Sequence, residues 1–303
     1  MHTSGNEGIS LMKNIISSVK NYFSLVKFSH TVFAMPFALI GYSLAVSETE
    51  YNFSLKLLLL VVLCMVFARN AAMGFNRLAD RKFDALNPRT SNREIPSGII
   101  GSRAAALFVI LNALFFILTT SFINRLTLYL SPVALLIILG YSLTKRFTYL
   151  CHFILGLGLS LAPIGAYIAL TGKFSIVPAV YSLIVLTWVS GFDIIYSLQD
   201  DEFDKLNNLH SVPSAAGIKN ALVISVFVHV ITFFLVIVAG LIGNGGGIFW
   251  SGAGLFSLFL LYQHLIVKHD DLSRVNLAFG TTNGVASILF AVFVILDMVF
   301  RYK

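Results

Sequence analysis

Nine apolar runs of roughly membrane-spanning length constrain the fold of this chain more than any other feature. A helix of roughly 20 apolar residues crosses the hydrocarbon core of a bilayer. The runs cover residues 29–47, 55–75, 104–122, 128–143, 150–170, 176–196, 218–242, 247–267 and 277–300. Because backbone amide and carbonyl groups cannot remain unpaired in lipid, each run is predicted to be helical. The sequence therefore predicts an all-α integral membrane protein with nine transmembrane helices.

The composition excludes an ordinary soluble domain. Hydrophobic residues make up 57% of the 303 residues and charged residues only 12%, whereas soluble domains carry roughly 25% charged residues. The net charge of +7 does not indicate nucleic-acid binding, because the basic residues lie between the apolar runs. In that position they set the orientation of a membrane protein. Membrane lipid is the expected environment, and no nucleic-acid partner is expected.

The run at 128–143 is the weakest of the nine, because it is short and contains Pro132. Merging it with the preceding run would give an eight-span protein. That helix would have to carry the polar residues Asn124 and Arg125 through the bilayer. We therefore predict two separate spans.

The distribution of lysine and arginine predicts the orientation in the membrane. If nine spans alternate, fifteen basic residues fall on the side that holds the N-terminus and five on the other, while Arg69 lies inside the second run. Basic residues accumulate on the cytoplasmic side. We predict a cytoplasmic N-terminal segment at 1–27, an uncleaved first span and an extracytoplasmic C-terminus. The cytoplasmic (inner) membrane is the expected location, and eight spans would break the charge alternation.

Two long charged loops, at about 76–103 and 197–217, lie on the predicted cytoplasmic side. Eight of the 14 acidic residues fall in or beside these loops. Function concentrates where polar residues are held on a rigid scaffold. We therefore expect the active site at these two loops.

The first of these loops begins with an acidic ladder. Asn76, Asp80 and Asp84 recur every four residues, so on a helix they share one face. The rise of about 1.5 Å per residue separates them by roughly 6 Å. Two carboxylates and an amide oxygen at this spacing can reach one or two hard cations, and Mg²⁺ is the natural ligand.

A second ladder stands at the end of the sixth run, where Asp193, Tyr196, Asp200 and Asp204 follow one another. Such residues could simply be solvated and paired with neighbouring lysines and arginines. Two ladders on one side, each beginning inside an apolar helix, favour bound cations instead. Since Mg²⁺ usually binds carboxylates together with phosphate oxygens, the predicted ligand is a phosphorylated molecule with a lipid-soluble remainder.

Other polar or small residues are interpreted as structural. Cys64 and Cys151 lack metal-ligand spacing and are expected to be small buried hydrophobes. Gly156 and Gly158 belong to no complete phosphate-binding motif and are expected to allow close helix packing. Three histidines are expected to be hydrogen-bonded helix residues: His152, His229 and His264.

The two ladders resemble the signatures of a known family. Asn76, Asp80 and Asp84 fit the NxxxDxxxD motif of the UbiA-type intramembrane aromatic prenyltransferases, and the second ladder fits their DxxYxxxDxxxD motif. Further similar stretches are residues 28–37, 87–90, Arg93, 96–98 and 145–148. The surroundings at 191–193 and 209–213 are most similar to the 4-hydroxybenzoate polyprenyltransferase-like branch.

The resemblance implies a single domain over residues 1–303, with nine helices around a central cavity open to the cytoplasm and to lipid. Mg²⁺ and a polyprenyl diphosphate would lie between the two Asp-rich segments. The implied metal ligands are Asn76, Asp80, Asp84, Asp200 and Asp204. The implied diphosphate ligands are Arg81, Lys145, Arg146 and Lys205. Arg89 and Arg93 also match the loop pattern, but lipid headgroups or pairing with Glu94 remain open roles for them.

The expected mechanism begins with neutralisation of the diphosphate leaving group by Mg²⁺ and the basic residues, Arg146 above all. Aromatic faces would stabilise the allylic cation, and the lipid-lined cavity would exclude water. An electron-rich aromatic acceptor would then attack C1 of the prenyl chain. Asp193 or the released diphosphate would remove the ring proton, Asp193 could also hold the acceptor phenol, and Tyr196 would orient either group.

The predicted reaction is prenylation of 4-hydroxybenzoate at C3, in quinone biosynthesis. Other acceptors remain open, namely a futalosine-pathway intermediate of menaquinone synthesis, a naphthoate, a haem or a chlorin. A CDP-alcohol phosphotransferase would need DGxxAR before its Asp ladder, which neither ladder has. An ion-coupled transporter is the alternative of a different class. Against it, the acids cluster at helix ends instead of the membrane midplane.

Overall fold

The computed structural model describes residues 20–26, 33–47 and 51–301. In these residues every regular element is helical and no strand occurs, so the predicted fold class is confirmed. Residues 20–26 form a short helix. The further helices are α2 (Met35–Ser47), α3 (Leu55–Ala79), α4 (Arg81–Leu86), α5 (Ser102–Ser121), α6 (Arg125–Thr144), α7 (Cys151–Thr171), α8 (Ile176–Ser197), α9 (Asp201–Leu206), α10 (Val212–Ile242), α11 (Gly247–Ile266) and α12 (Asn283–Arg301). A 3₁₀ turn, η2 (Leu198–Asp200), follows α8, and a π-helical segment, η3 (Leu277–Thr282), precedes α12.

Eight helical segments of the described chain are long and apolar enough to cross a membrane. They correspond to the runs predicted from 55–75 onward. The first run, 29–47, is helical over Met35–Ser47, and residues 29–32 lie outside the described residues. Thirteen helical residues extend about 20 Å, less than the roughly 30 Å of a hydrocarbon core. Nine membrane crossings therefore remain a prediction.

The run that is weakest in the sequence forms a complete helix, α6. Asn124 caps its N-terminus, because its side-chain oxygen accepts a hydrogen bond from the Thr127 amide at 2.9 Å. The Asn124 amide group also donates to the Ile168 carbonyl of α7 at 2.9 Å. Pro132 is accommodated within the helix. Since Asn124 separates α5 from α6, two separate helices of membrane-spanning length are present.

Helix α10 begins earlier than the predicted start at residue 218. Ser211 caps the helix at Val212 through a capping box with Ser214. Gly217 then interrupts the helix with φ of +79° and ψ of +160°, a conformation that a side chain would strain. The apolar run of the sequence corresponds to the straight part of α10 after this kink.

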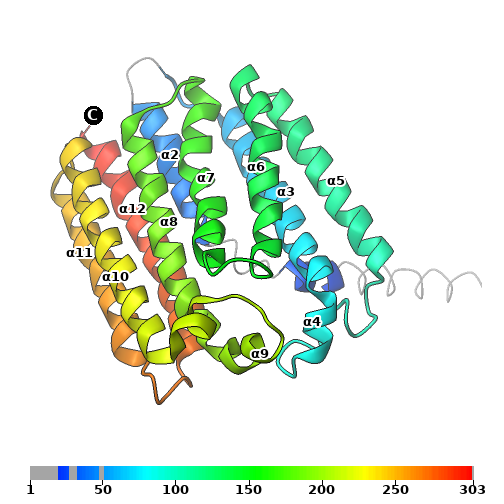
Figure 1. Ribbon diagram of the computed structural model, residues 1–303. Helices are drawn as coiled ribbons and strands as arrows, with labels where there is room; N and C mark the ends of the chain where they lie inside the picture. The colour runs from blue at the N-terminus through cyan, green and yellow to red at the C-terminus, as the bar shows by residue number, and fades with distance from the viewer. Residues whose placement is uncertain (1–19, 27–32, 48–50, 302–303) are drawn as a thin grey trace, which may run out of the picture.

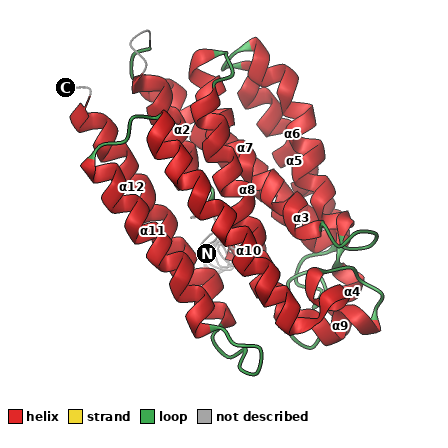
Figure 2. Cartoon of the chain, turned by 60° about the vertical axis from the view of Figure 1, so that its left-hand side comes forward, coloured by secondary structure: helices red, strands yellow, loops and turns green. Residues whose placement is uncertain are grey.

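The helices are arranged around α8, which carries more buried residues than any other described helix. α8 packs against α7 and α10, α7 also contacts α2 and α6, and α3 lies against α5. Figure 1 shows α3, α5 and α6 on one side of the bundle and α10, α11 and α12 on the other. α4 and α9 lie beside each other at one end, opposite the C-terminus (Figures 1 and 2). We call this end of the bundle the α4/α9 end.

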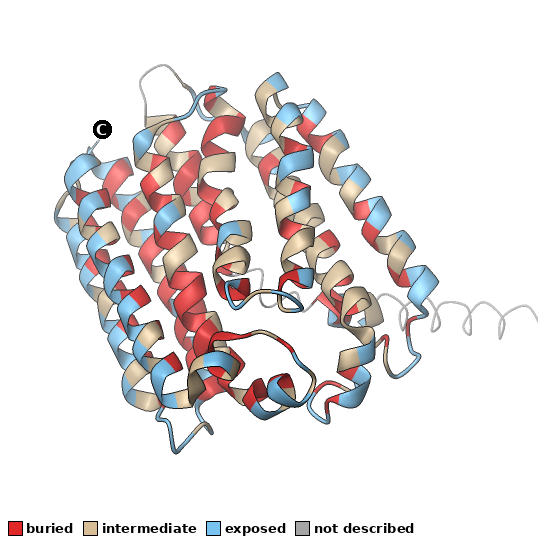
Figure 3. Ribbon diagram, in the orientation of Figure 1, coloured by how far each residue is buried: buried red, intermediate tan, exposed pale blue. Residues whose placement is uncertain are grey.

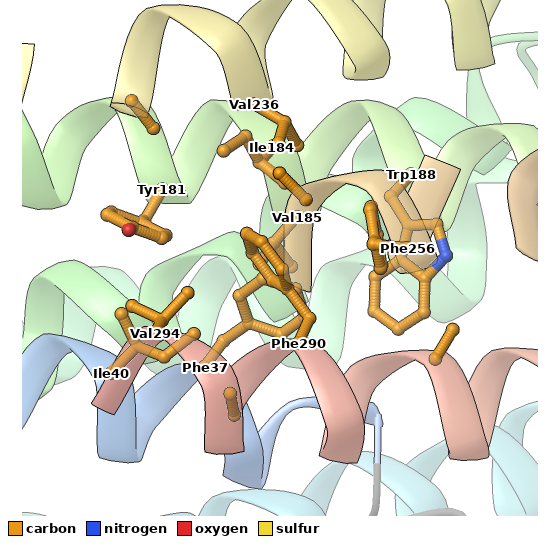
Figure 4. Packing of buried hydrophobic residues seen from close by; sticks show 14 of the residues in the cluster. Phe37, Ile40, Tyr181, Ile184, Val185, Trp188, Val236, Phe256, Phe290 and Val294 are labelled. Atoms are coloured by element: carbon orange, nitrogen blue, oxygen red, sulfur yellow. The ribbon is translucent and has the colours of Figure 1, made fainter. Parts of the chain in front are cut away.

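The core is dense with aromatic rings and lies on the side of α8 that faces α2, α11 and α12. Trp188 is fully buried, and its ring centroid is 5.3 Å from that of Phe37 and 5.8 Å from that of Phe256. Figure 4 shows these rings together with Phe290. By contrast, α10 and α11 carry exposed apolar side chains such as Phe227 and Leu258, as expected for surfaces that contact lipid. Figure 3 colours many residues of these two helices as exposed.

Two of the glycines bring the backbones of neighbouring helices into contact. A Cβ atom at Gly41 of α2 would lie 1.9 Å from the Pro163 carbonyl oxygen of α7, and one at Gly156 of α7 would lie 2.4 Å from the Leu186 carbonyl oxygen of α8. The packing role predicted for Gly156 is confirmed. At Gly158 a Cβ atom would make only an ordinary contact of 3.6 Å with Ile138.

Candidate active site

The first acidic ladder runs from the end of α3 into α4. Asn76 lies in the last turn of α3, Asp80 stands at the junction, and Asp84 lies in α4. The Asp80 amide donates to the Asn76 carbonyl at 2.9 Å, and the Asp84 amide donates to the Asp80 carbonyl at 2.8 Å. Because the helical register continues through the junction, the three side chains share one face. All three line the same cavity.

The second ladder changes helix type as it proceeds. Asp193 and Tyr196 lie in α8, Asp200 ends the turn η2, and Asp204 lies in α9. Asp193, Tyr196 and Asp200 line the cavity that the first ladder lines, whereas Asp204 is fully buried outside the lining. The structure therefore brings together six of the seven ladder residues of the two motifs.

Four carboxylates of the ladders are each paired with a cationic side chain. The four ion pairs are Asp80–Arg146 at 3.3 Å, Asp84–Arg93 at 2.7 Å, Asp200–Arg89 at 2.5 Å and Asp204–Lys145 at 2.7 Å. Arg89 contacts both carboxylate oxygens of Asp200 and also donates to the Tyr196 hydroxyl at 3.0 Å. Arg93 pairs with Asp84 and not with Glu94. The pairing with Glu94 that the sequence left open is therefore not formed.

The close packing of these charges perturbs their pKa values. Burial, and then the neighbouring Asp84 carboxylate, raise the pKa of Asp80 above its ordinary value, while Arg146 opposes this rise. Burial alone would lower the pKa of Lys145, but the Asp204 carboxylate outweighs it, so the pKa is raised. Asp200 and Tyr196 raise the pKa of Arg89 against burial in the same way. Lys145 and Arg89 therefore remain cationic, while Asp80 holds its proton more readily than an ordinary aspartate.

A cavity of about 260 Å³ lies between the ladders. Its lining includes residues of α4 and η2. Its acidic lining residues are Asp80, Asp84, Asp193 and Asp200. Its lysine and arginine lining residues are Arg69, Arg77, Arg89, Arg93, Lys145 and Arg146. The cations outnumber the carboxylates, so the cavity favours an anionic ligand.

Two basic residues expected at the diphosphate do not line this cavity. Arg81 donates from Nη1 to the Leu78 carbonyl at 2.7 Å. Lys205 donates to Asp201 Oδ2 at 2.8 Å and is half exposed. Of the four expected diphosphate ligands, Lys145 and Arg146 line the cavity.

The sequence interpretation assigned no role in the site to two arginines of α3 that line the cavity, Arg69 and Arg77. The Nε atoms of both are shielded from solvent and have no hydrogen-bond partner within the described residues. Arg77 is only 4% exposed. Arg77 directly follows the motif residue Asn76, and this position could have indicated a role in the site. Arg69 was identified from the sequence only as an isolated charge within an apolar run. An unpaired cation in a span is a feature of functional sites.

His152 is another lining residue whose contact was not predicted. Its Nδ1 atom lies 2.6 Å from Asp193 Oδ2, which confirms the expectation of a hydrogen-bonded histidine and adds the partner. Asn87 also reaches the site, because its side-chain amide donates to Asp200 Oδ1 at 3.1 Å. These partners are 41 and 113 residues apart in the chain, so motif spacing could not reveal them.

Beyond the charged groups, the cavity wall is aromatic and apolar. Phe33, Phe192 and Phe279 line it together with Leu155. The ring of Phe279 stacks on Tyr196 at a centroid distance of 4.0 Å and meets the Phe192 ring at 5.5 Å. The site thus combines a charged part that suits phosphate and a metal with an apolar part that suits a hydrocarbon chain.

These features define an all-helical integral membrane protein with a charged cavity at one end of an apolar bundle. The model of the UbiA prenyltransferase family matches residues 34–294. The chain therefore belongs to the UbiA prenyltransferase family, as the two motifs indicated. It is an enzyme of the prenyltransferase class, and neither the CDP-alcohol phosphotransferase nor the transporter interpretation is retained.

Relatives in this family agree with that assignment. A 4-hydroxybenzoate octaprenyltransferase from Aliivibrio fischeri (strain ATCC 700601 / ES114) is 30% identical over 239 residues, which cover 77% of this chain and 81% of the relative. One from Vibrio campbellii (strain ATCC BAA-1116) is 31% identical over 237 residues, covering 78% of this chain and 83% of the relative.

Solved structures show the same architecture. The apo structure of a UbiA homolog from Aeropyrum pernix K1 matches with a TM-score of 0.80 at 31% identity, covering 89% of this chain and 98% of that one. A UbiA homolog from Archaeoglobus fulgidus bound to DMAPP and Mg²⁺ matches with a TM-score of 0.73, covering 92% of this chain and 99% of that one. Its identity is 20%, so it bears on the fold alone.

Proposed function

We propose that this enzyme transfers the polyprenyl group of a polyprenyl diphosphate to C3 of 4-hydroxybenzoate in a Mg²⁺-dependent reaction. The observation that carries the proposal is the cavity in which both acidic ladders meet a surplus of cations beside an aromatic wall. The relatives named 4-hydroxybenzoate octaprenyltransferase support the choice of acceptor. A naphthoate or a futalosine-pathway intermediate are the other acceptors that the test must address.

The residues of the cavity fit a magnesium ion. Within the described residues, no three His, Cys, Asp or Glu side chains form a ready metal-binding group, and four of the ladder carboxylates are paired with cations. The donor set nevertheless consists of oxygen atoms, which Mg²⁺ prefers. Asp84 Oδ2 is buried with no hydrogen-bond partner, an arrangement that costs energy unless a cation is bound. Asn76, Asp80, Asp84 and Asp200 would hold the ion directly or through water, with Asp204 supporting them through Lys145.

When bound, Mg²⁺ would offset the charge that develops on the diphosphate as the allylic C–O bond breaks. Lys145 and Arg146 are the best candidates among the predicted residues to hold diphosphate oxygens, because both line the cavity. Arg89 and Arg93 line it too and are already oriented by carboxylates. Charged hydrogen bonds of this kind are strongest where water is excluded.

The aromatic wall would protect the allylic cation. Phe279 and Phe192 present ring surfaces near Tyr196, and an aromatic face stabilises a cation by about 0.5–2 kcal/mol. The apolar lining also excludes water, which would otherwise capture the cation and yield a prenyl alcohol.

The acceptor would lie between α3 and α8. Asp193 lines the cavity from α8 and would accept the ring proton or hold the phenol, with Tyr196 orienting the ring. Arg69, seven residues before Asn76 on α3, lies about 10 Å further along the helix. Arg69 belongs to none of the four ion pairs of the ladders. It could therefore bind the acceptor carboxylate while the cations of those pairs remain available to the diphosphate.

We further assign the α4/α9 end to the cytoplasm. The charged segments 80–101 and 198–211 lie at this end, and the surplus of basic residues in the sequence belongs to the same side. The N-terminal segment 1–27 would then be cytoplasmic, although residues 1–19 and 27 lie outside the described part. We treat residues 1–303 as one catalytic domain.

The test is a prenyl-transfer assay on detergent-purified protein with Mg²⁺, 4-hydroxybenzoate and a series of polyprenyl diphosphates. We expect 3-prenyl-4-hydroxybenzoate, with EDTA abolishing the product and Asp80→Asn lowering turnover roughly 100-fold. Glu202→Gln is the matched control, because Glu202 is exposed on α9 and does not line the cavity. Mg²⁺-dependent diphosphate binding without product would contradict this acceptor. Turnover that persists in EDTA would contradict the metal assignment.

A further inference from the structure

His152 joins three elements of the structure at the candidate base, Asp193. It lies in the first turn of α7 with a side chain that is only 3% exposed. Its Nδ1 atom is 2.6 Å from Asp193 Oδ2 on α8. Its Nε2 atom accepts a hydrogen bond from the Val212 amide, the first residue of α10, at 3.2 Å. A single buried ring therefore connects α7, α8 and the start of α10.

This geometry assigns the protonation of the ring. Because Nε2 accepts the Val212 N–H, Nε2 carries no proton. The one proton of the neutral imidazole must then sit on Nδ1, where it is donated to Asp193. An imidazolium would direct a second N–H at the Val212 N–H, with no acceptor between them. Nδ1 is therefore the donor of the pair, and Asp193 Oδ2 is the acceptor.

The two oxygens of Asp193 are in different surroundings as a result. Oδ2 is held by His152, while Oδ1 makes no hydrogen bond within the described residues. The side chain is 20% exposed and lines the cavity. A neighbour that fixes one carboxylate oxygen leaves the other aimed at the substrate, which is the usual role of an orienting partner.

We propose that His152 is the positioning residue for Asp193, holding Oδ2 so that Oδ1 faces the aromatic acceptor; this rests on the proposed function. As the bond from the ring carbon to prenyl C1 forms, the C1–O electron pair leaves with the diphosphate and the ring proton passes to Asp193 Oδ1. His152 keeps its own proton throughout. The Val212 N–H, by donating to Nε2, strengthens the Nδ1–H as a donor.

Two variants separate positioning from packing. His152→Asn retains an N–H that can donate to Asp193, whereas His152→Leu fills similar space without a donor. We expect His152→Leu to lower the acceptor-dependent kcat about 10- to 100-fold, the loss typical of a supporting partner. His152→Asn should stay within about fivefold of the wild type, which one retained hydrogen bond of about 1 kcal/mol would allow. The KM for polyprenyl diphosphate should be unchanged in both, because His152 contacts none of the four ion pairs.

A spectroscopic measurement decides the assignment independently of activity. In ¹⁵N-histidine-labelled protein, the His152 signal, identified by its loss in His152→Asn, should show the Nδ1–H tautomer. A proton on Nε2, or a His152→Leu variant with wild-type kcat, would overturn the proposal. If the wild type leaves 4-hydroxybenzoate unprenylated, the proposed function fails, and the tautomer measurement then decides the geometry of the pair.

Discussion

Recognition of the acceptor carboxylate by Arg69 can be tested by changing both partners. Arg69 forms no ion pair within the described residues, and its Nε atom is shielded from solvent without a hydrogen-bond partner. A hydrogen bond between charged groups contributes about 1.5–3 kcal/mol. Since every 1.4 kcal/mol corresponds to a factor of ten, loss of the contact should raise the acceptor KM about 10- to 150-fold.

The assay compares 4-hydroxybenzoate with phenol, which lacks the carboxylate, in the wild type and in Arg69→Met. The wild type should lose affinity when the carboxylate is removed, but Arg69→Met should treat the two acceptors nearly alike. The KM for polyprenyl diphosphate should not change. Removing a charge from water carries a desolvation cost, so replacing the partly buried Arg69 by a long apolar side chain should not lower the denaturation temperature.

Two results would refute this reasoning about Arg69. One is an equal loss of activity towards phenol and 4-hydroxybenzoate, which would indicate a general structural role. The other is an increase in the KM for the diphosphate alone, which would assign Arg69 to the leaving group.

The remaining predictions concern the diphosphate ligands, the metal ligands and the helix packing. Arg146→Ala should raise the KM for polyprenyl diphosphate about 10- to 100-fold through loss of charged hydrogen bonds. Arg81→Ala is the control and should change this KM little, because Arg81 lies outside the cavity lining. Equal increases in KM for the two variants would contradict the assignment of Arg146. Because burial and Asp84 raise the pKa of Asp80, protons should compete with Mg²⁺ more strongly than at an ordinary aspartate, so lowering the pH should raise the Mg²⁺ concentration needed for half-maximal diphosphate binding. The same pH dependence in Asp80→Asn, titrated beside the wild type, would be inconsistent with Asp80 as a ligand. A Cβ atom at Gly191 would lie 2.3 Å from a histidine nitrogen of α10, so Gly191→Ala should lose about 1–3 kcal/mol of stability. Its matched control is Gly254→Ala, which meets nothing within 4 Å, and thermal denaturation in detergent compares the two.

The sequence was sufficient for the eight long apolar helices from residue 55 onward and for most of the charged residues that line the cavity. Apolar runs predict transmembrane helices well because lipid leaves the backbone no alternative. Helix ends were less predictable where they depend on capping or on one backbone torsion. From the sequence, Asn124 indicated only a polar break between two apolar runs, and the structure adds its capping of α6. The kink at Gly217 separates the start of α10 from the apolar part that the sequence predicted.

The partners of the acidic residues could not be predicted from spacing. Arg89 and Asp200 are separated by 111 residues, and the tertiary arrangement of the helices brings the two segments together. The same holds for His152 and Asp193. Arg81 and Lys205 were expected at the diphosphate because they adjoin motif residues, but the direction of a side chain at a helix end depends on local contacts. Each makes its contact nearby, with Leu78 and Asp201 respectively.

The four ion pairs have a consequence for the order and strength of ligand binding. A metal ion that binds alone must separate a carboxylate from its cation and leave that cation uncompensated. A diphosphate that binds alone must do the reverse and leave a carboxylate uncompensated. When both bind, the carboxylates turn to the metal and the cations to the diphosphate, so no charge is left without a partner. The two ligands should therefore enhance each other's affinity by the same factor. Either ligand should bind more weakly alone than in the presence of the other.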